Sequence, residues 1–227
     1  MYEDEHLLVL HKPAGLLCVP GRGEDKQDCL SARAQQRWPG ALIVHRLDQA
    51  TSGLVLMARH IDAQRRLSHA FAERQVHKRY QAVVWGLLAA QEGAWNEINL
   101  PIAADWERRP LRVIDPAHGK PSLTRWRLLG HHPANGTSRI ELEPVTGRTH
   151  QLRVHMAEMK CPIVGDGKYG GGAAHIKGGV ELSGRLHLQA WRIHLPPMFG
   201  KGERSFEAPI APHIAASLDG LGLSVGE

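Results

Sequence analysis

One polar stretch of the sequence combines residue types that are able to do chemistry. It runs from Val44 to Leu54, contains His45-Arg46-Leu47-Asp48, and lies between two apolar segments. Functional side chains concentrate on loops that a rigid sheet holds in place. Arg46 and Asp48 therefore form a candidate charged site, although an Arg and an Asp two residues apart are also commonly an ordinary ion pair. The residue types do not by themselves indicate a reaction.

A glycine-rich stretch late in the chain has the spacing of a nucleotide-binding loop. Gly165-Asp166-Gly167-Lys168-Tyr169-Gly170 matches GxGxxG. A dinucleotide loop needs a helix directly after its glycines and an acidic residue about 20 residues further on. More glycines follow here, so we reject this interpretation and expect a mobile loop over 165–179. The sequence therefore predicts no nucleotide cofactor.

Cysteine and histidine residues form no metal-binding pattern. Cys18, Cys29 and Cys161 are odd in number and far apart, which predicts three reduced thiols rather than disulfides. There are 15 histidines, but none forms an HExxH motif, and His150 and His155 are not spaced to share one helix face. We expect no metal site.

Hydrophobic periodicity predicts strands on both sides of the Asp48 loop. Short apolar runs bounded by turn residues predict strands over 7–10, 41–44, 53–58, 80–85, 123–129, 138–145, 186–195 and 205–208. The proline-rich segment 87–122 is interpreted as irregular. Strands outnumber helices and do not alternate strictly with them, which predicts an α+β fold with a mixed, largely antiparallel central sheet.

Three helices are predicted from their caps and apolar stripes. We expect a helix over 29–38 capped by Asp28, and one through about residue 74 capped by Asp62, with Leu67, Ala70 and Phe71 on one face. A third is expected over 150–160, capped by Thr149.

Composition and charge limit the class of protein. The 227 residues are 42% hydrophobic and 22% charged, as in an ordinary globular protein. A net charge of +5 makes nucleic acid a plausible partner. The sequence has no run of about 18 apolar residues and no apolar stretch of a signal peptide near its start. We therefore expect a cytoplasmic protein without a membrane-spanning helix.

Five blocks of the sequence together resemble one known family. His45 to Leu54 reads HRLDxATSGL and is similar to the signature of the RluA-type RNA pseudouridine synthases. The other blocks follow the order of that family and are Lys12–Leu16 with Val19–Gly21, Lys78–Gly86, Gly147–Met156 and Pro162–Gly170. The match extends from about residue 4 to about residue 209. Five ordered blocks are much more specific than one short motif.

The resemblance implies a reaction and three catalytic residues. A uridine in structured RNA leaves its stack, the bond between N1 and C1′ breaks, and the base rejoins the ribose through C5. Asp48 would be essential, either as nucleophile or as the base that yields a glycal, and both routes stay open. Arg153 would pair with the carboxylate of Asp48, and Tyr80 would lie against the uracil and help to remove the C5 proton. No cofactor is implied.

The resemblance also implies contacts with RNA. Arg46 would fill the space left by the flipped base or touch the backbone, and Leu188 would pack on the uracil; Lys78 and Arg148 are further expected RNA contacts. Other basic residues that could grip phosphates, with aromatic help from Trp106, are Arg22, Arg79, Arg108, Arg109 and Arg112.

The expected organisation is a single catalytic domain over 1–227 that acts as a monomer. Its ordered core would span about 4–209, without an N-terminal S4 domain, and a loosely attached tail would follow over about 212–227. The expected substrates are loop uridines of tRNA (anticodon loop), 23S rRNA or both. Two departures from the family pattern, His11 for Asn and Gln189 for His, leave the RNA preference open. The alternative is an RNA-binding module of the same fold that has lost turnover.

Overall fold

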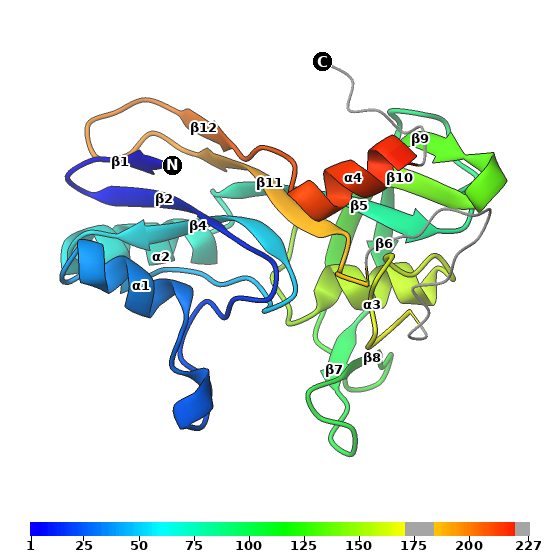
Figure 1. Cartoon of the computed structure of the whole chain (residues 1–227), viewed down its shortest axis with the longest axis horizontal. Helices are drawn as coiled ribbons and strands as arrows, with labels where there is room; N and C mark the ends of the chain where they lie inside the picture. The colour runs from blue at the N-terminus through cyan, green and yellow to red at the C-terminus, as the bar shows by residue number, and fades with distance from the viewer. Residues whose placement is uncertain (171–183, 221–227) are drawn as a thin grey trace. The chain divides into compact units, whose positions relative to one another are not determined.

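The computed structural model describes residues 1–170 and 184–220. The chain divides into two compact units, and each is described by itself. Unit 1 comprises Met1–Lys78 and Ala190–Pro209, and unit 2 comprises Arg79–Gln189 and Ile210–Glu227. The boundaries fall within two strands, β5 (His77–Trp85) and β11 (Leu188–Leu195). Figure 1 labels the α-helices of both units and their strands other than β3.

Unit 1 is built on strands in the order β1-β2-β4-β11, in which β1 with β2 and β2 with β4 pair antiparallel. A short strand β3 pairs with β4, and β12 pairs with β11. The bounds of the strands not yet given are β1 Tyr2–Glu3, β2 Leu7–Lys12, β3 Leu42–Ile43, β4 Ser52–Ala58 and β12 Arg204–Glu207. The strands predicted from apolar runs over 7–10, 53–58 and 205–208 are therefore confirmed, with ends that differ by a few residues.

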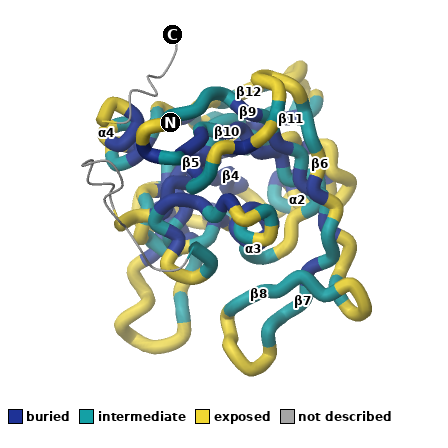
Figure 2. Tube along the Cα trace, turned by 90° about the vertical axis from the view of Figure 1, so that its right-hand side faces the viewer, coloured by how far each residue is buried: buried dark blue, intermediate teal, exposed yellow. Residues whose placement is uncertain are grey.

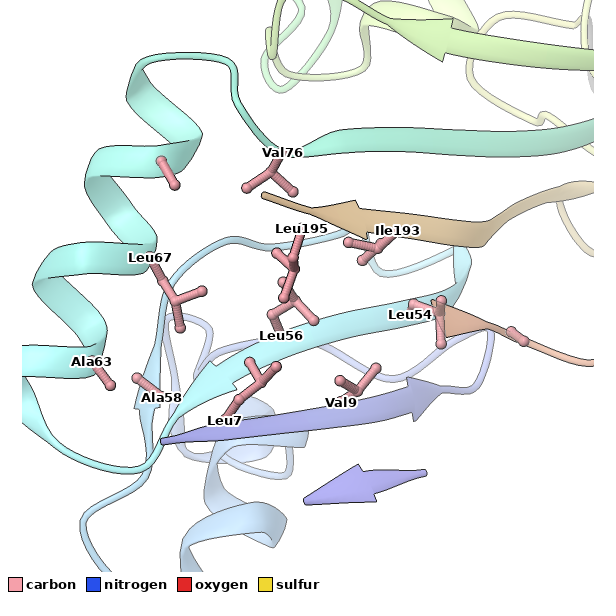
Figure 3. Close-up of a cluster of buried hydrophobic side chains, with 12 residues drawn as sticks. Leu7, Val9, Leu54, Leu56, Ala58, Ala63, Leu67, Val76, Ile193 and Leu195 are labelled. Carbon is pink, nitrogen blue, oxygen red and sulfur yellow. The ribbon is translucent and has the colours of Figure 1, made fainter. Parts of the chain in front are cut away.

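The core of unit 1 lies between this sheet and helix α2 (Ile61–Ala72) (Figure 3). Leu7 and Leu56 from adjacent strands and Leu67 from α2 are each fully buried. Alternation along the strands puts every second apolar side chain on this face. The other members of the cluster are Val9, Leu54, Ala58, Ala63, Ala70, Val76, Ile193, Leu195 and Ala208. The apolar stripe predicted for α2 is thus confirmed for Leu67 and Ala70.

The helices of unit 1 begin with caps other than the predicted aspartates. Helix α1 (Leu30–Arg37) is capped by Cys29, whose Sγ accepts from the backbone N–H of Ala32 at 3.4 Å. Helix α2 is capped by His60, whose Nδ1 accepts from Ala63 at 3.3 Å. The prediction of Asp28 and Asp62 as caps is wrong: each carboxylate instead forms an ion pair with an exposed arginine on its own helix. A single-turn 3-10 helix, η1 (Glu24–Lys26), precedes α1.

Unit 2 is built on a second antiparallel set of strands, with the order β5-β10-β9-β6. The bounds of three of these are β6 Trp95–Asn99, β9 Leu123–His132 and β10 Thr137–Pro144. β9 and β10 pair as a hairpin, which confirms the strands predicted over 123–129 and 138–145, and a 3-10 turn, η2 (Pro133–Asn135), lies in its loop. The α+β class with a largely antiparallel sheet is confirmed.

Segment 87–122, predicted to be irregular, contains three strands. β6 is the outer strand beside β9, and only Ile98 is buried in it, so its sequence carries little apolar signal. β7 (Ile102–Ala104) and β8 (Arg112–Ile114) pair with each other in a separate hairpin. Figure 2 shows that the connection between β7 and β8 is exposed to solvent.

The prediction of a loosely attached tail over 212–227 is wrong for residues 212–220. Residues Pro212–Gly220 form helix α4, which buries Ile214 and Leu218 against Val83. Gln189 supports the start of this helix, because its Oε1 accepts from the backbone N–H of Ala211 at 2.7 Å. The departure from the family pattern at residue 189 therefore has a structural role in unit 2. Residues 221–227, and most of the loop predicted over 165–179, lie outside the described residues.

Candidate active site

The loop that carries Asp48 connects β3 to β4. It is anchored to the rest of unit 1 through Leu47, which stands between Arg46 and Asp48, and through Gly53. The backbone N–H of Leu47 donates to Sγ of the buried Cys18 at 3.2 Å. Gly53, the second residue of β4, lies so close to the backbone of Ala190 that a Cβ at this position would collide with it. Arg46 is exposed and Asp48 is half-buried. The loop therefore has a fixed backbone from which these two side chains project.

Lys12 anchors the same loop from the first block of the family resemblance. Its side chain is fully buried. Its ammonium group donates to the carbonyl oxygens of Pro13 at 2.9 Å, Leu16 at 2.8 Å and Gln49 at 3.0 Å. Burial lowers the pKa of Lys12 to about 8, against the opposing influence of Cys18 and then Asp48. The sequence marked this lysine only as part of a motif, and the structure identifies it as the group that joins the first motif to the Asp48 loop.

His45 fixes the start of the loop. Its Nε2 accepts from the backbone N–H of Leu56 in β4 at 2.9 Å, and its ring packs on Phe71 with the centroids 4.6 Å apart. Desolvation and the nearby charge of Lys78 lower the pKa of His45 to about 3. The ring is therefore neutral at physiological pH and acts as a hydrogen-bond acceptor in the fold.

Lys78, an expected RNA contact, also lies beside Phe71. Its ammonium nitrogen is 5.7 Å from the centroid of that ring, a cation–π distance. Burial lowers the pKa of Lys78. A contact between Lys78 and RNA stays a prediction.

Tyr80 lies in unit 2, on β5, and is 8% exposed. It pairs with Leu142 of β10, which pairs in turn with Trp126 of β9, so the three side chains share one face of the sheet. Helix α3 (Gln151–Glu158) covers this face, because His155 of that helix binds Thr124 of β9, two residues along from Trp126. Tyr80 and Arg153, which α3 carries, therefore lie on the same side of the sheet.

Leu188 points to that side as well. Gln189 contacts the residue that precedes α4, and α4 packs on Val83. Val83 lies on the face opposite Tyr80, because the two are separated by an odd number of positions in β5. Alternation along β11 then directs Leu188, which is 3% exposed, toward the face of Tyr80. Unit 2 thus brings three of the predicted site residues to one face.

The guanidinium of Arg153 is held by the carboxylate of Asp166. Nε of Arg153 donates to Oδ2 of Asp166 at 2.7 Å, and Nη2 donates to Oδ1 at 2.7 Å. Both side chains are buried, with 5% and 0% of their surface exposed. A bidentate pair of this kind fixes both position and orientation. The sequence did not single out Asp166, because it stands in a glycine-rich stretch and nothing local indicates its partner.

A polar network fixes the start of α3. Oε1 of Gln151 accepts from the backbone N–H of Arg148 at 3.0 Å, and Nε2 of Gln151 donates to Thr124 at 3.1 Å. His150, which precedes the helix, has a φ of 57°, in the left-handed region. The predicted Thr149 cap is therefore wrong, and a side chain inside the helix takes its place. Arg148 itself is exposed and its Nε donates to Pro121 at 3.3 Å.

Several basic residues that were expected to grip phosphates have partners within unit 2. Arg79 pairs with the buried Glu141 at 2.8 Å, and its guanidinium lies 4.6 Å from the Trp95 ring centroid. Arg108 pairs with Asp105 at 2.7 Å. In the β7–β8 connection, Trp106 is 72% exposed, and the guanidinium of Arg109 lies 3.8 Å from its ring centroid. Trp106 and Arg109 are therefore more accessible to RNA than Arg79 and Arg108, which form ion pairs with carboxylates.

Within residues 1–170 and 184–220, no group of three or more His, Cys, Asp or Glu side chains is arranged to hold a metal ion. The carboxylate of Asp166, which lies in the GxGxxG match, turns toward Arg153 and toward the backbone N–H groups of Lys168 and Tyr169. An anionic side chain at this place does not suit a loop that binds phosphate. No helix among the described residues is long and apolar enough to span a membrane.

A sequence model of the RNA pseudouridylate synthase family matches residues 6–158 of the chain. The match includes Asp48, Tyr80 and Arg153. The chain belongs to the RNA pseudouridylate synthase family. This identification agrees with the resemblance of the five sequence blocks.

Curated proteins and solved structures that resemble this chain are also pseudouridine synthases. The chain is 42% identical to the dual-specificity RNA pseudouridine synthase RluA of Yersinia pestis over 88% of this chain and 93% of the relative. It is 40% identical to the RluA protein of Escherichia coli K12 over 92% of this chain and 91% of the relative. The structure of human RNA pseudouridylate synthase domain containing 1 matches with a TM-score of 0.74 and 29% identity, covering 95% of this chain and 85% of that one.

Proposed function

We propose that this pseudouridine synthase isomerises loop uridines in tRNA, in its anticodon loop, in 23S rRNA, or in both. The observation that carries the proposal is the anchored loop of unit 1, which holds Asp48 at the position where the family motif has its essential aspartate. Its relatives of about 40% identity are dual-specificity RNA pseudouridine synthases over nearly their full length. Loop uridines are the expected targets because a base leaves a loop at a lower energetic cost than it leaves a duplex.

In the proposed reaction, Asp48 acts at the ribose of the flipped uridine. Its carboxylate either attacks C1′ or removes a proton from the sugar to give a glycal, and in both routes the bond from C1′ to N1 of uracil breaks. The base then turns and C5 bonds to C1′, which breaks the ester to Asp48 in the first route and returns the sugar proton from Asp48 in the second. The hydrogen on C5 leaves as a proton and N1 gains a proton, so the product has the same composition as the substrate.

Arg153 and Tyr80 support this chemistry in the proposal. The guanidinium of Arg153 stabilises the ionised carboxylate of Asp48 by charge and hydrogen bonding. Tyr80 lies against the uracil and helps to remove the C5 proton, and Leu188 packs on the base. These roles are supported by the positions of Tyr80, Leu188 and Arg153, which all face the same side of the sheet of unit 2.

Contacts with the RNA backbone complete the proposed function. The exposed Arg46 occupies the space that the flipped base leaves or touches a phosphate, and Lys78 and Arg148 contribute further positive charge. Isomerisation transfers no electrons and no phosphate, so we propose a reaction without metal or nucleotide cofactor. We further propose that residues 1–227 act as one catalytic domain, as a monomer, in the cytoplasm.

The experiment that tests this function maps pseudouridine in unmodified transcripts of tRNA and 23S rRNA after incubation with the protein. Carbodiimide labelling followed by primer extension locates each modified position. We expect stops at one or a few loop uridines with the wild-type protein, in buffer with a metal chelator, and none with Asp48→Asn. Asp62→Asn is the matched control, because Asp62 is an exposed aspartate on α2, and it should give the wild-type pattern.

A wild-type protein that binds these RNAs but modifies no uridine would support the alternative, an RNA-binding module without turnover. Activity at the same positions with Asp48→Asn would also contradict the proposal. Stops in only one of the two RNAs would decide between tRNA and rRNA as the substrate.

A further inference from the structure

We propose that Asp166 and Tyr169 are positioning residues that fix the guanidinium of Arg153 for the isomerisation. This inference rests on the proposed function, in which Arg153 supports the ionised Asp48. It assigns a role to the segment that follows α3, which no part of the mechanism above uses.

The first observation is the geometry of the pair between Arg153 and Asp166. The side-on edge of the guanidinium, formed by Nε and Nη2, carries two hydrogen bonds of 2.7 Å to the carboxylate. Two bonds from one edge prevent rotation about the Nε–Cζ axis and in the plane of the group. The end-on edge, formed by Nη1 and the second hydrogen of Nη2, consequently points away from Asp166. That edge is the one able to meet a further carboxylate.

The second observation is that Asp166 is itself fixed by the backbone. Its Oδ1 accepts from the N–H of Lys168 at 3.0 Å and from the N–H of Tyr169 at 3.2 Å, in addition to Nη2 of Arg153. The backbone N–H of Gly170 donates to the carbonyl oxygen of Asp166 at 2.7 Å, which closes the turn. A buried carboxylate held in this way cannot follow the guanidinium if the latter moves, so it sets the position of Arg153 rather than adapting to it.

The third observation is the placement of Tyr169. Its ring centroid lies 5.2 Å from Cζ of Arg153, so the aromatic face limits the guanidinium on a second side. Its hydroxyl oxygen accepts from the backbone N–H of Arg112 at 2.9 Å and lies 2.7 Å from Nδ1 of His150. One side chain thus connects Arg153 with the first residue of β8 and with the residue that precedes α3.

These contacts have a consequence for catalysis. An arginine that supports a developing charge works best when it is oriented before the reaction, because no reorganisation is then needed. Displacement of such a group by about 1 Å costs on the order of 100-fold in rate. Loss of Asp166 should therefore slow the chemical step and leave RNA affinity nearly unchanged, because the affected groups are buried.

The test measures the single-turnover rate constant and, separately, the Kd for an RNA that the wild-type protein modifies. We expect Asp166→Asn to lower the rate constant on the order of 100-fold with an unchanged Kd. Tyr169→Phe keeps the ring and removes only the hydroxyl, so it should fold and lower the rate about fivefold. Asp62→Asn breaks a matched but exposed aspartate–arginine pair and should change neither quantity.

A double-mutant cycle separates a positioning role from general loss of structure. If Asp166 acts through Arg153, the double variant Arg153→Met with Asp166→Asn should be no slower than Arg153→Met itself. The double variant should also melt at a higher temperature than Asp166→Asn, which leaves a buried guanidinium without its carboxylate.

Wild-type rates for both Asp166→Asn and Tyr169→Phe, or additive losses in the double variant, would overturn the inference. Its failure is distinguishable from failure of the proposed function. If the latter is wrong, the wild-type protein forms no pseudouridine. If only the inference is wrong, Asp48→Asn is inactive and Arg153→Met is slowed to a rate that is still measurable, while Asp166→Asn keeps its activity.

Discussion

Nζ of Lys12 lies 3.0 Å from the carbonyl oxygen of Gln49, the residue that follows Asp48 in the chain. The two residues are 37 positions apart, and the bond joins the end of β2 to the loop between β3 and β4. The other two donors of the same ammonium hold the carbonyl oxygens of Pro13 and Leu16. A buried lysine thus organises the backbone around the candidate catalytic aspartate.

Replacement of Lys12 by Met should destabilise the protein. The apolar side chain fills a similar volume but leaves three carbonyl oxygens without this donor, and buried acceptors without a partner are costly. We expect a decrease of about 3 kcal/mol in the free energy of unfolding, measured by urea denaturation. Lys26→Met removes an exposed lysine and should change stability by less than about 0.5 kcal/mol. Equal stability of the two variants would show that the Lys12 bonds do not hold the loop.

Replacement of Arg46 by Ala should weaken RNA binding more than it slows chemistry. Arg46 is exposed beside Asp48 and is expected to touch the RNA. We expect Kd to rise roughly tenfold, and the slope of log Kd against log salt to change by about one if the contact is to a phosphate. Arg65→Ala, on the exposed side of α2, is the control and should leave Kd unchanged. A large decrease in the single-turnover rate constant with an unchanged Kd would assign Arg46 to the chemistry instead.

Tyr80 allows the ring and the hydroxyl to be tested separately. If the hydroxyl takes part in removal of the C5 proton, Tyr80→Phe should lower the single-turnover rate about 100-fold or more. Uridine deuterated at C5 should then react more slowly than ordinary uridine, because loss of the C5 hydrogen becomes rate-limiting. Tyr80→Leu tests the role of the ring against the base and should be slower still. A wild-type rate for Tyr80→Phe would leave Tyr80 with a packing role only.

The elements that the sequence predicted well are those in which one pattern dominates. The apolar run over 7–10 forms a strand because both of its faces are buried, and Leu67 and Ala70 lie on the buried face of α2 as expected. The helix starts were predicted less well, since Cys29 and His60 act as caps through side chains that are weaker cap formers than the neighbouring aspartates. β6 was missed because an outer strand needs few apolar residues.

Some residues of the candidate site could be predicted from local sequence motifs, and others could not. Resemblance supplied Asp48, Tyr80 and Arg153, whose motifs are local in sequence. The roles of Lys12 and Asp166 depend on partners that are distant in the chain or belong to the backbone, and no local pattern records such partners. The roles of Lys12 and Asp166 could therefore be recognised only from the structure.

The buried His187 should make stability depend on pH. Burial lowers its pKa from 6.5 to about 4, so the unfolded chain binds more protons than the folded one between these values. The contribution of neutral His187 to the free energy of unfolding is therefore fully present above the unfolded pKa of 6.5 and is lost as the pH decreases toward the folded pKa of about 4. Between pH 6.5 and pH 5, this one residue should account for about 2 kcal/mol.

Urea denaturation at the two pH values measures this contribution in His187→Gln, which cannot titrate. The decrease in stability between them should be smaller in this variant than in the wild-type protein by that amount. His118→Gln, at an exposed position, should keep the wild-type dependence. Identical pH dependence in all three proteins would mean that His187 is charged in the folded state or does not affect acid stability.

The most direct test of the account is release of tritium from RNA that carries tritium at C5 of its uridines. Formation of the bond between C5 and C1′ expels this hydrogen, so each turnover releases one tritium into water. With excess enzyme, we predict release of one equivalent for each modified loop uridine by the wild-type protein, and none by Asp48→Asn, although the variant binds the same RNA with a similar Kd. Tritium release by Asp48→Asn at the wild-type rate would contradict the central role of Asp48.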